Sequence, residues 1–330
     1  MLSIIIPTRN RADLLACALG SLTNQTLSPG HFEILVIDNG STDHTTTVVK
    51  DLTSTLDNLQ YHHEPEPGLH AGRHRGMMAA KGEILVFADD DIEALPTWLV
   101  AIEEAFSDQD VTMAGGNNLP MFLETPPTWL TALWNRPTDL SGRALPALSM
   151  LELTGPPRNI SPYYVWGCNF AIRKDVLIKA GGFHPDGMPK ESIRFRGDGE
   201  THVSRFVAES GMKCLFHPGA SVYHKVSPER MTIGYFRQRG FNQGISDSYT
   251  QLRGEVVASA CKHSLSFRVV RWGWRNLRRL WSSQYFRRDK GEQRAISEFE
   301  AGHREGFAYH QSAYRDDPEV REWVHRKRYY

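Results

Sequence analysis

The sequence predicts an α/β fold with a mostly parallel sheet flanked by helices, followed by a mainly helical C-terminal region. Two observations lead to this prediction. Short apolar runs alternate with helix-length segments through about the first 117 residues, which is the pattern of strand–helix–strand units. Beyond about residue 227 we expect mainly helix, rich in arginine and aromatic residues.

Each element of the first half has its own signal. Residues 2–8 (LSIIIPT) are apolar and β-branched, which predicts a buried strand. Residues 11–22 repeat leucine and alanine on one helical face, which predicts a helix. Residues 32–45 predict a second strand that ends in a cluster of turn residues, where Ser41 or Asp43 can cap the following helix.

The alternation continues through the next segments. A weak third strand is expected at 59–68, and a helix closed by glycine at 70–82. The apolar run 83–89 predicts the fourth strand, and 96–106 a helix that starts with proline. A fifth strand is expected at 111–117. These units predict a helix-covered parallel sheet.

The pattern then breaks and resumes. Residues 118–165 are dense in proline and tryptophan, which predicts long loops over a cleft. A strand–helix unit is expected at 164–183, a helix at 197–211, and a last strand or hairpin at 213–226.

We therefore divide the chain into an α/β domain at 1–226, with parts at about 1–117 and about 118–226, and a helical, Arg- and aromatic-rich region at 227–330.

Composition excludes several classes of protein. The formal net charge of +0 argues against nucleic acid as a partner. The four cysteines lack C-x-x-C spacing, which argues against a disulfide framework and favours a reducing compartment. The N-terminus lacks the features of a signal peptide, and no run approaches a membrane span, so we expect a cytoplasmic protein.

Polar clusters follow four of the predicted strands, at 7–10 (PTRN), 38–43 (DNGSTD), 64–68 (EPEPG) and 89–91 (DDD). Ligands of open parallel sheets bind beyond the carboxyl ends of the strands, so these clusters predict one site. The chain has no G-x-G-x-x-G after its first strand, no P-loop and no G-x-S-x-G, which argues against dinucleotide oxidoreductases, P-loop NTPases and α/β-hydrolases.

From about Ser3 to His224 the ordered segments SIIIPTRNR, FEILVIDNGSTDHT and GLHAGRHRGMMAAKGEILVFADDD resemble the family 2 glycosyltransferases, which have the Rossmann-like GT-A fold. The resemblance implies an inverting enzyme that depends on Mn²⁺ or Mg²⁺ and takes a nucleotide-diphosphate sugar. It also implies that 1–226 is the catalytic domain, in which about 1–117 binds the nucleotide sugar and about 118–226 forms the acceptor side and carries the base.

The acidic triplet resembles the family's D-x-D motif. The resemblance implies that Asp91 binds a divalent cation bridging the donor's phosphates and that Asp89 holds the ribose and supports the metal, with Asp90 between them. Carboxylate oxygens suit Mg²⁺ and Mn²⁺. His224, after the last strand, would complete the metal shell, or it is structural. The non-functional alternative for the triplet is a solvated acidic turn.

The same resemblance predicts the donor pocket. Asp38 matches the position that binds the nucleotide base, and Pro7, Thr8 and Arg9 line that pocket. Arg73 matches a family arginine, although its neighbours differ from the usual A-R-N. The alternative for Arg73 is an exposed arginine on a helix surface.

The segment RGDGETHVSRF stands where the family has its acidic base motif, typically G-E-D-x-E. Glu200 is the first candidate for the base, because it shares a helical face with Val203, Phe206 and Val207 and so points inward. Asp198 is the second candidate, and it also suits the N-cap of that helix. The alternative is that Glu200 is not a base and only interacts favourably with the dipole at the start of the helix.

Residues 262–288 contain no acid and carry three tryptophans among arginines. This composition is typical of a peripheral membrane-surface helix, which would place the protein at the inner face of the membrane; a helix packed on the catalytic domain is the alternative.

Taken together, these features predict transfer of a sugar from a UDP-sugar to a hydroxyl of a glycan or lipid-linked acceptor in polysaccharide or envelope biosynthesis. A sugar nucleotidyltransferase, or a sugar-nucleotide-binding protein without transferase activity, remains the alternative.

Overall fold

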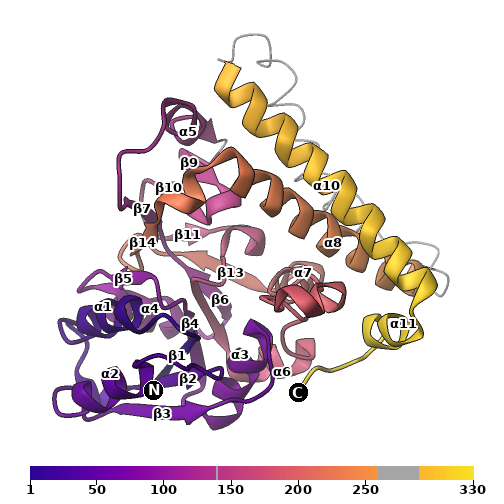
Figure 1. Cartoon of the computed structure of the whole chain (residues 1–330). Helices are drawn as coiled ribbons and strands as arrows, with labels where there is room; N and C mark the ends of the chain where they lie inside the picture. The colour runs from indigo at the N-terminus through magenta and orange to yellow at the C-terminus, as the bar shows by residue number, and fades with distance from the viewer. Residues whose placement is uncertain (139, 259–289) are drawn as a thin grey trace.

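The computed structural model describes residues 1–138, 140–258 and 290–330. Within these residues the strands form two sheets (Figure 1). The larger sheet has eight strands, in the spatial order β11 (Arg158–Asn159), β13 (Lys213–Phe216), β6 (Val111–Gly115), β12 (Asn169–Arg173), β4 (Ile84–Ala88), β1 (Leu2–Thr8), β2 (Phe32–Asp38) and β3 (Leu59–His63).

The larger sheet is mostly parallel. Strand β1 runs parallel to both β2 and β4, and β2 parallel to β3. Strand β12 is antiparallel to its neighbours β4 and β6.

The α-helices of the described residues are α1 (Ala12–Leu22), α2 (Thr45–Leu52), α3 (Leu69–Ala79), α4 (Trp98–Ser107), α5 (Thr128–Trp134), α6 (Lys174–Ala180), α7 (Thr201–Glu209), α8 (Ile233–Ala258), α10 (Lys290–Asp316) and α11 (Pro318–Val324). The predicted α/β fold is confirmed.

Helices cover both faces of this sheet. Successive side chains of a strand point to opposite faces, so one strand contributes to the core on each side. Ile4 and Ile6 of β1 belong to the core that includes Leu15 and Leu19 of α1. Ile5, between them, belongs to a second core on the α3 and α6 side. Both faces of β1 are therefore buried, as its continuous apolar run predicts.

The second sheet is a correction to the predicted loops at 118–165. Its six strands are β5 (Ile92–Ala94), β14 (Val222–Val226), β7 (Asn118–Phe122), β10 (Met150–Leu153), β9 (Gly142–Leu145) and β8 (Pro137–Thr138). These strands are short, and β9 is half-buried along its whole length, so its burial does not alternate between two faces. Strand β10 meets β7 at Asn118, before Pro120, so a proline is tolerated there.

Two further boundaries differ from expectation. Strand β3 ends at His63, five residues before the predicted end at 68. The segment 213–226 does not form a hairpin, because β13 pairs with β6 in the larger sheet whereas β14 pairs with β5 and β7 in the smaller one.

Helices α8 and α10 lie side by side in the C-terminal region (Figure 1). Four glycines allow this close approach. A Cβ added at Gly240 or Gly244 of α8, or at Gly302 or Gly306 of α10, would come within 2.1 Å of the partner helix's backbone. The predicted membrane-surface segment, 262–288, lies outside the described residues. Among the residues that are described, no helix has the length and apolar character needed to cross a membrane.

We expect Gly240→Ala to destabilise the protein, because the new methyl group would lie 2.0 Å from the carbonyl oxygen of Phe299. Overpacking of this kind costs about 1–3 kcal/mol in free energy of unfolding. Gly254→Ala, in the same helix with no atom within 4 Å of the added carbon, is the matched control. It should stabilise by up to about 1 kcal/mol, because alanine is the better helix former. Denaturant unfolding of both variants decides, and equal effects would contradict the close packing.

Candidate active site

The acidic triplet joins the two sheets. Strand β4 ends at Ala88 and β5 begins at Ile92, so Asp89, Asp90 and Asp91 form the connection between them. The side chain of Asp89 is 31% exposed, whereas those of Asp90 and Asp91 are 3% and 8% exposed. A solvated acidic turn is therefore excluded.

Arginine side chains neutralise the two buried carboxylates. Arg11 lies 2.7 Å from Asp90 Oδ1 and 2.7 Å from Asp91 Oδ2. Thr8 Oγ1 donates a hydrogen bond of 2.7 Å to Asp90 Oδ2. Burial raises the pKa of Asp90 to about 7 against the opposing charge of Arg11. Burial also acts to raise the pKa of Asp91, but its neighbours His224, Arg11 and Arg230 outweigh it and hold that pKa well below its usual value.

His224 of β14 is buried beside Asp91. Its Nε2 lies 3.4 Å from Asp91 Oδ1 and 3.3 Å from Arg230 Nη1. Arg230 Nη1 also lies 3.3 Å from Asp91 Oδ2. Asp91 Oδ1 and His224 Nδ1 are buried and accept or donate no hydrogen bond within the described part of the chain.

These donors fit a divalent cation chemically, although the cluster is not a complete protein cage. A carboxylate oxygen without a hydrogen-bond partner faces an imidazole nitrogen, and both are donor types that Mn²⁺ accepts. Across residues 1–138, 140–258 and 290–330, no group of three or more His, Cys, Asp or Glu side chains is arranged as a metal site. Mg²⁺ and similar ions in such sites commonly take further ligands from substrate phosphates and water.

Arg73 of α3 connects the acidic triplet to Glu200. Its guanidinium lies 3.5 Å from Asp89 Oδ1 and 3.5 Å from Glu200 Oε2. The Arg73 side chain is 3% exposed and lies over the ring of Phe183, with Cζ 5.2 Å from the ring centroid. A Cβ at residue 167 would lie 2.2 Å from Arg73 Nη2, so Gly167 leaves room for the guanidinium. The alternative of a surface arginine is wrong.

Glu200 faces this cluster with its side chain 25% exposed. Its Oε1 accepts a 3.4 Å hydrogen bond from Gly167 N. Glu200 occupies the N-cap position of α7, yet its side chain makes no capping bond. The prediction that Asp198 caps this helix is therefore wrong.

Asp198 is instead enclosed by hydrogen-bond donors. Its side chain is 2% exposed. Oδ1 lies 2.6 Å from His184 Nδ1, and Oδ2 accepts bonds of 2.7 and 2.8 Å from Arg205 and Thr250. Burial acts to raise the pKa of Asp198, but His184 and Arg205 outweigh it and keep the pKa well below its usual value.

The predicted donor pocket lies at the ends of β1 and β2. Thr8 and Asp38 are register partners on these strands. Asp38 is buried, and its two oxygens accept bonds of 2.7 Å from Ser41 N and from Tyr61 Oη. Pro7 is buried and Arg9 is exposed. Asp38 is thus held rigidly at the strand end, and its role toward the nucleotide base stays a prediction.

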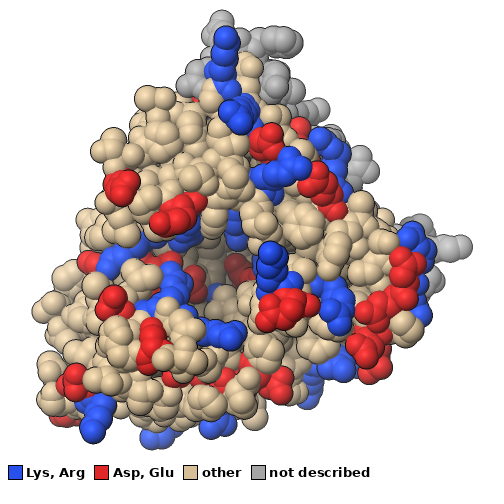
Figure 2. Space-filling model, viewed as in Figure 1, with Lys and Arg blue, Asp and Glu red and all other residues tan. Residues whose placement is uncertain are grey.

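Sequence reasoning missed Arg11 and Arg230 as members of the site. Arg11 lies in the segment PTRNR, three residues after Thr8, and its place beside the end of the first strand is a signal for a role in the site. Arg230 had no such signal, because only the fold brings it to Asp91, 139 positions away. On the face in Figure 2, acidic and basic side chains gather in a hollow between the N-terminal half and α8.

Comparison with known proteins identifies the family. The family model described as Glycosyl transferase family 2 matches residues 3–181, more than half of the chain. The chain belongs to this family. The resemblance predicted from the sequence is therefore confirmed.

Two individual relatives of this family 2 chain match over shorter stretches. It is 35% identical over 116 residues to the glycosyltransferase AglE of Haloferax volcanii, a match that covers 35% of this chain and 38% of AglE. It is 38% identical over 96 residues to the GalNAc(5)-diNAcBac-PP-undecaprenol beta-1,3-glucosyltransferase of Campylobacter jejuni, covering 28% and 30%. The chain thus spans well under half the length of these relatives.

Among solved structures, the mannosyltransferase PcManGT from Pyrobaculum calidifontis in complex with GDP-Man and Mn²⁺ matches with a TM-score of 0.56. The match covers 92% of this chain and 86% of that one at 16% identity. This likeness concerns the fold and supports the predicted GT-A class.

Proposed function

We propose that the protein is a metal-dependent, inverting glycosyltransferase that moves a sugar from a nucleotide-diphosphate sugar to an acceptor hydroxyl. The position of Arg73 carries this proposal, because its guanidinium lies 3.5 Å from both Asp89 and Glu200. The D-x-D segment and a partly exposed carboxylate therefore meet within the reach of one side chain, as a transfer between a donor diphosphate and a nearby hydroxyl requires.

On this proposal Asp91, Asp89 and His224 would hold Mn²⁺ or Mg²⁺. When bound, the cation supplies Lewis-acid stabilisation of the charge that develops on the leaving diphosphate. Arg11 and Arg230 keep Asp91 ionised and oriented. Pro7, Thr8, Arg9 and Asp38 would line the pocket for the nucleotide.

Glu200 would accept the proton of the acceptor hydroxyl while its oxygen attacks the anomeric carbon from the face opposite the diphosphate. The carboxylate has the required exposure, and its contacts with Arg73 and Gly167 N set its direction. Asp198 is the weaker candidate for this role, because both its oxygens are already paired and its side chain is buried.

We propose a UDP-sugar as donor and a glycan or lipid-linked acceptor. The acceptor class is supported by the undecaprenol-linked acceptor named for the C. jejuni relative, and a metal-dependent donor by the GDP-Man and Mn²⁺ of the structural neighbour. A thermal-shift panel of nucleotide sugars, with and without Mn²⁺, identifies the nucleotide. A stabilising shift with GDP-mannose and none with UDP-sugars would replace the uridine assignment.

Asp91→Asn is expected to weaken the binding of UDP in the presence of Mn²⁺ by at least about 10-fold. A neutral amide is a poor ligand for a hard cation, and even indirect partners of a metal contribute about 10–100-fold to affinity. Calorimetry with UDP, with Mn²⁺ or with EDTA, measures the effect. Asp51→Asn, an exposed carboxylate of α2, is the control and should bind as the wild type does. Unchanged metal-dependent affinity in a folded Asp91→Asn variant would refute the metal assignment.

A further inference from the structure

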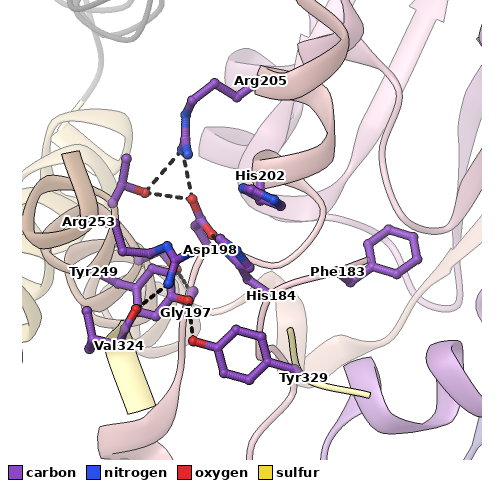
Figure 3. A network of polar contacts seen from close by, with 12 residues as sticks. Phe183, His184, Gly197, Asp198, His202, Arg205, Tyr249, Arg253, Val324 and Tyr329 are labelled. Atoms are coloured by element: carbon purple, nitrogen blue, oxygen red, sulfur yellow. Dashed lines mark hydrogen bonds and ion pairs between the residues drawn. The ribbon is translucent and has the colours of Figure 1, made fainter. Parts of the chain in front are cut away.

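A set of buried and half-buried polar residues connects the C-terminal helices to the segment that carries Glu200. The residues of this bracing network lie close together in Figure 3, and ring contacts of His184 with Tyr249 and Tyr329 connect the hydrogen bonds around Asp198 to the bond between the two tyrosines. Its members are His184, Asp198, Arg205, Tyr249, Thr250 and Tyr329.

Asp198 is the point where three parts of the chain meet. His184 belongs to the loop after α6, Arg205 to α7 and Thr250 to α8. Three donors share the two oxygens of one carboxylate, at distances between 2.6 and 2.8 Å. Arg205 Nη2 also lies 3.3 Å from Thr250 Oγ1, which closes the arrangement. Since Asp198 is two positions before Glu200, this arrangement limits the movement of the Glu200 backbone.

The backbone around Asp198 is held as well. Gly197 N donates to Pro185 O at 2.8 Å, and Gly197 O accepts from Ser246 Oγ of α8 at 2.8 Å. A Cβ at Gly197 would lie 3.0 Å from the Tyr249 ring, so α8 packs directly against the backbone of this segment. Gly199 has a φ of 55°, a left-handed conformation that glycine adopts without strain.

The last residues of the chain reach both sides of the candidate site. Tyr329 Oη lies 2.7 Å from Tyr249 Oη, beside Gly197. The carbonyl oxygen of Tyr329 lies 3.2 Å from Nδ1 of His74, and His74 is the residue that follows Arg73 in the sequence. His74 Nε2 accepts a bond from Phe183 N, so the proton sits on Nδ1 and is donated to Tyr329. One C-terminal residue therefore supports the neighbours of both Arg73 and Glu200.

We propose that α8 and the C-terminal segment position Glu200 for proton transfer, with Asp198, Thr250 and Tyr329 as positioning residues. This inference rests on the proposed function. Each of the three acts on Glu200 through the backbone of 197–199 and the start of α7. The C-terminal region is then part of the catalytic unit rather than an appendage to it.

Thr250→Val tests the proposal, because it keeps the shape of the side chain and removes the bond to Asp198. We expect kcat for sugar transfer to fall about 10-fold, since small misplacements of a reacting group are costly, while the donor KM stays within about twofold. Thr250→Ser restores the hydroxyl and should recover the wild-type kcat. Tyr329→Phe, at the other end of the network, should reproduce the split between kcat and KM.

Amide hydrogen exchange in residues 196–201 provides a readout that does not depend on activity. Exchange there should accelerate in Thr250→Val and Tyr329→Phe, and not in Thr250→Ser, while protection of β1 is unchanged. Wild-type kcat and exchange in both folded variants would overturn the positioning role. An equal loss in Thr250→Ser would also overturn it. If the wild-type protein transfers no sugar to any acceptor, the proposed function fails, and exchange alone then decides whether the network holds the segment.

Discussion

Glu200→Gln should lower the turnover of sugar transfer by about 10²–10⁴-fold, the usual contribution of a general base. Glutamine keeps the shape of the side chain and can still accept the hydrogen bond from Gly167 N, but it cannot take a proton from the acceptor hydroxyl. Arg73 retains its contact with Asp89, so the donor side is preserved. The affinity for UDP with Mn²⁺ should therefore stay within about twofold. Steady-state kinetics with a confirmed acceptor, paired with calorimetry, measure both quantities.

Glu209→Gln, at the exposed end of the same helix, is the control and should turn over as the wild type does. The prediction is wrong if Glu200→Gln retains near-normal turnover. If Asp198→Asn loses turnover without loss of stability while Glu200→Gln remains active, Asp198 is the base. Should a variant lacking both carboxylates still transfer sugar, an inverting mechanism with a protein base would have to be abandoned.

The first half of the fold could be predicted because its periodicity is strong. Ile4, Ile5 and Ile6 are fully or almost fully buried on the two faces of one sheet, and Leu15 and Leu19 repeat at helical spacing against it. The smaller sheet could not be predicted in the same way. The burial pattern of β9 does not alternate, and β8 has only two residues, so pairing with distant strands rather than local pattern determines both.

The candidate site shows the same limit. The position of the acidic triplet follows from the end of a predicted strand, whereas the ion pair of Asp91 with Arg230 depends on contact between residues far apart in sequence. Asp198 illustrates the other difficulty. Its spacing before a helix suits an N-cap. Donors from α7 and α8 instead take its Oδ2, and His184 takes its Oδ1, which a local rule cannot anticipate.

Asp198→Asn should lower the free energy of unfolding by about 2–4 kcal/mol, a larger loss than we expect from Gly240→Ala. Removing one partner of a buried pair leaves the other charge uncompensated, at a cost of about 3–5 kcal/mol, and the 19% exposure of the Arg205 side chain reduces that figure. Asparagine is also a poor substitute for the hydrogen bonds, because its amide group would face donors. Denaturant unfolding at pH 7 measures the loss.

The pH dependence of this difference separates the charge from the shape of the side chain. The folded-state pKa of Asp198 is depressed below its unfolded value of about 3.9. The stabilisation from its ionised form is therefore fully present above about pH 5 and is lost as the pH falls toward the folded-state pKa. Burial lowers the folded-state pKa of His184, and Asp198 acts against that shift, so the gap between wild type and Asp198→Asn should not shrink between about pH 7 and 5. It should narrow below about pH 4, where Asp198 itself is protonated. Asp175→Asn, which breaks an exposed pair with Lys179, should cost at most about 0.5 kcal/mol. A gap that is equally small for both variants, or one that does not narrow in acid, would show that Asp198 contributes packing rather than charge to the network that holds Glu200.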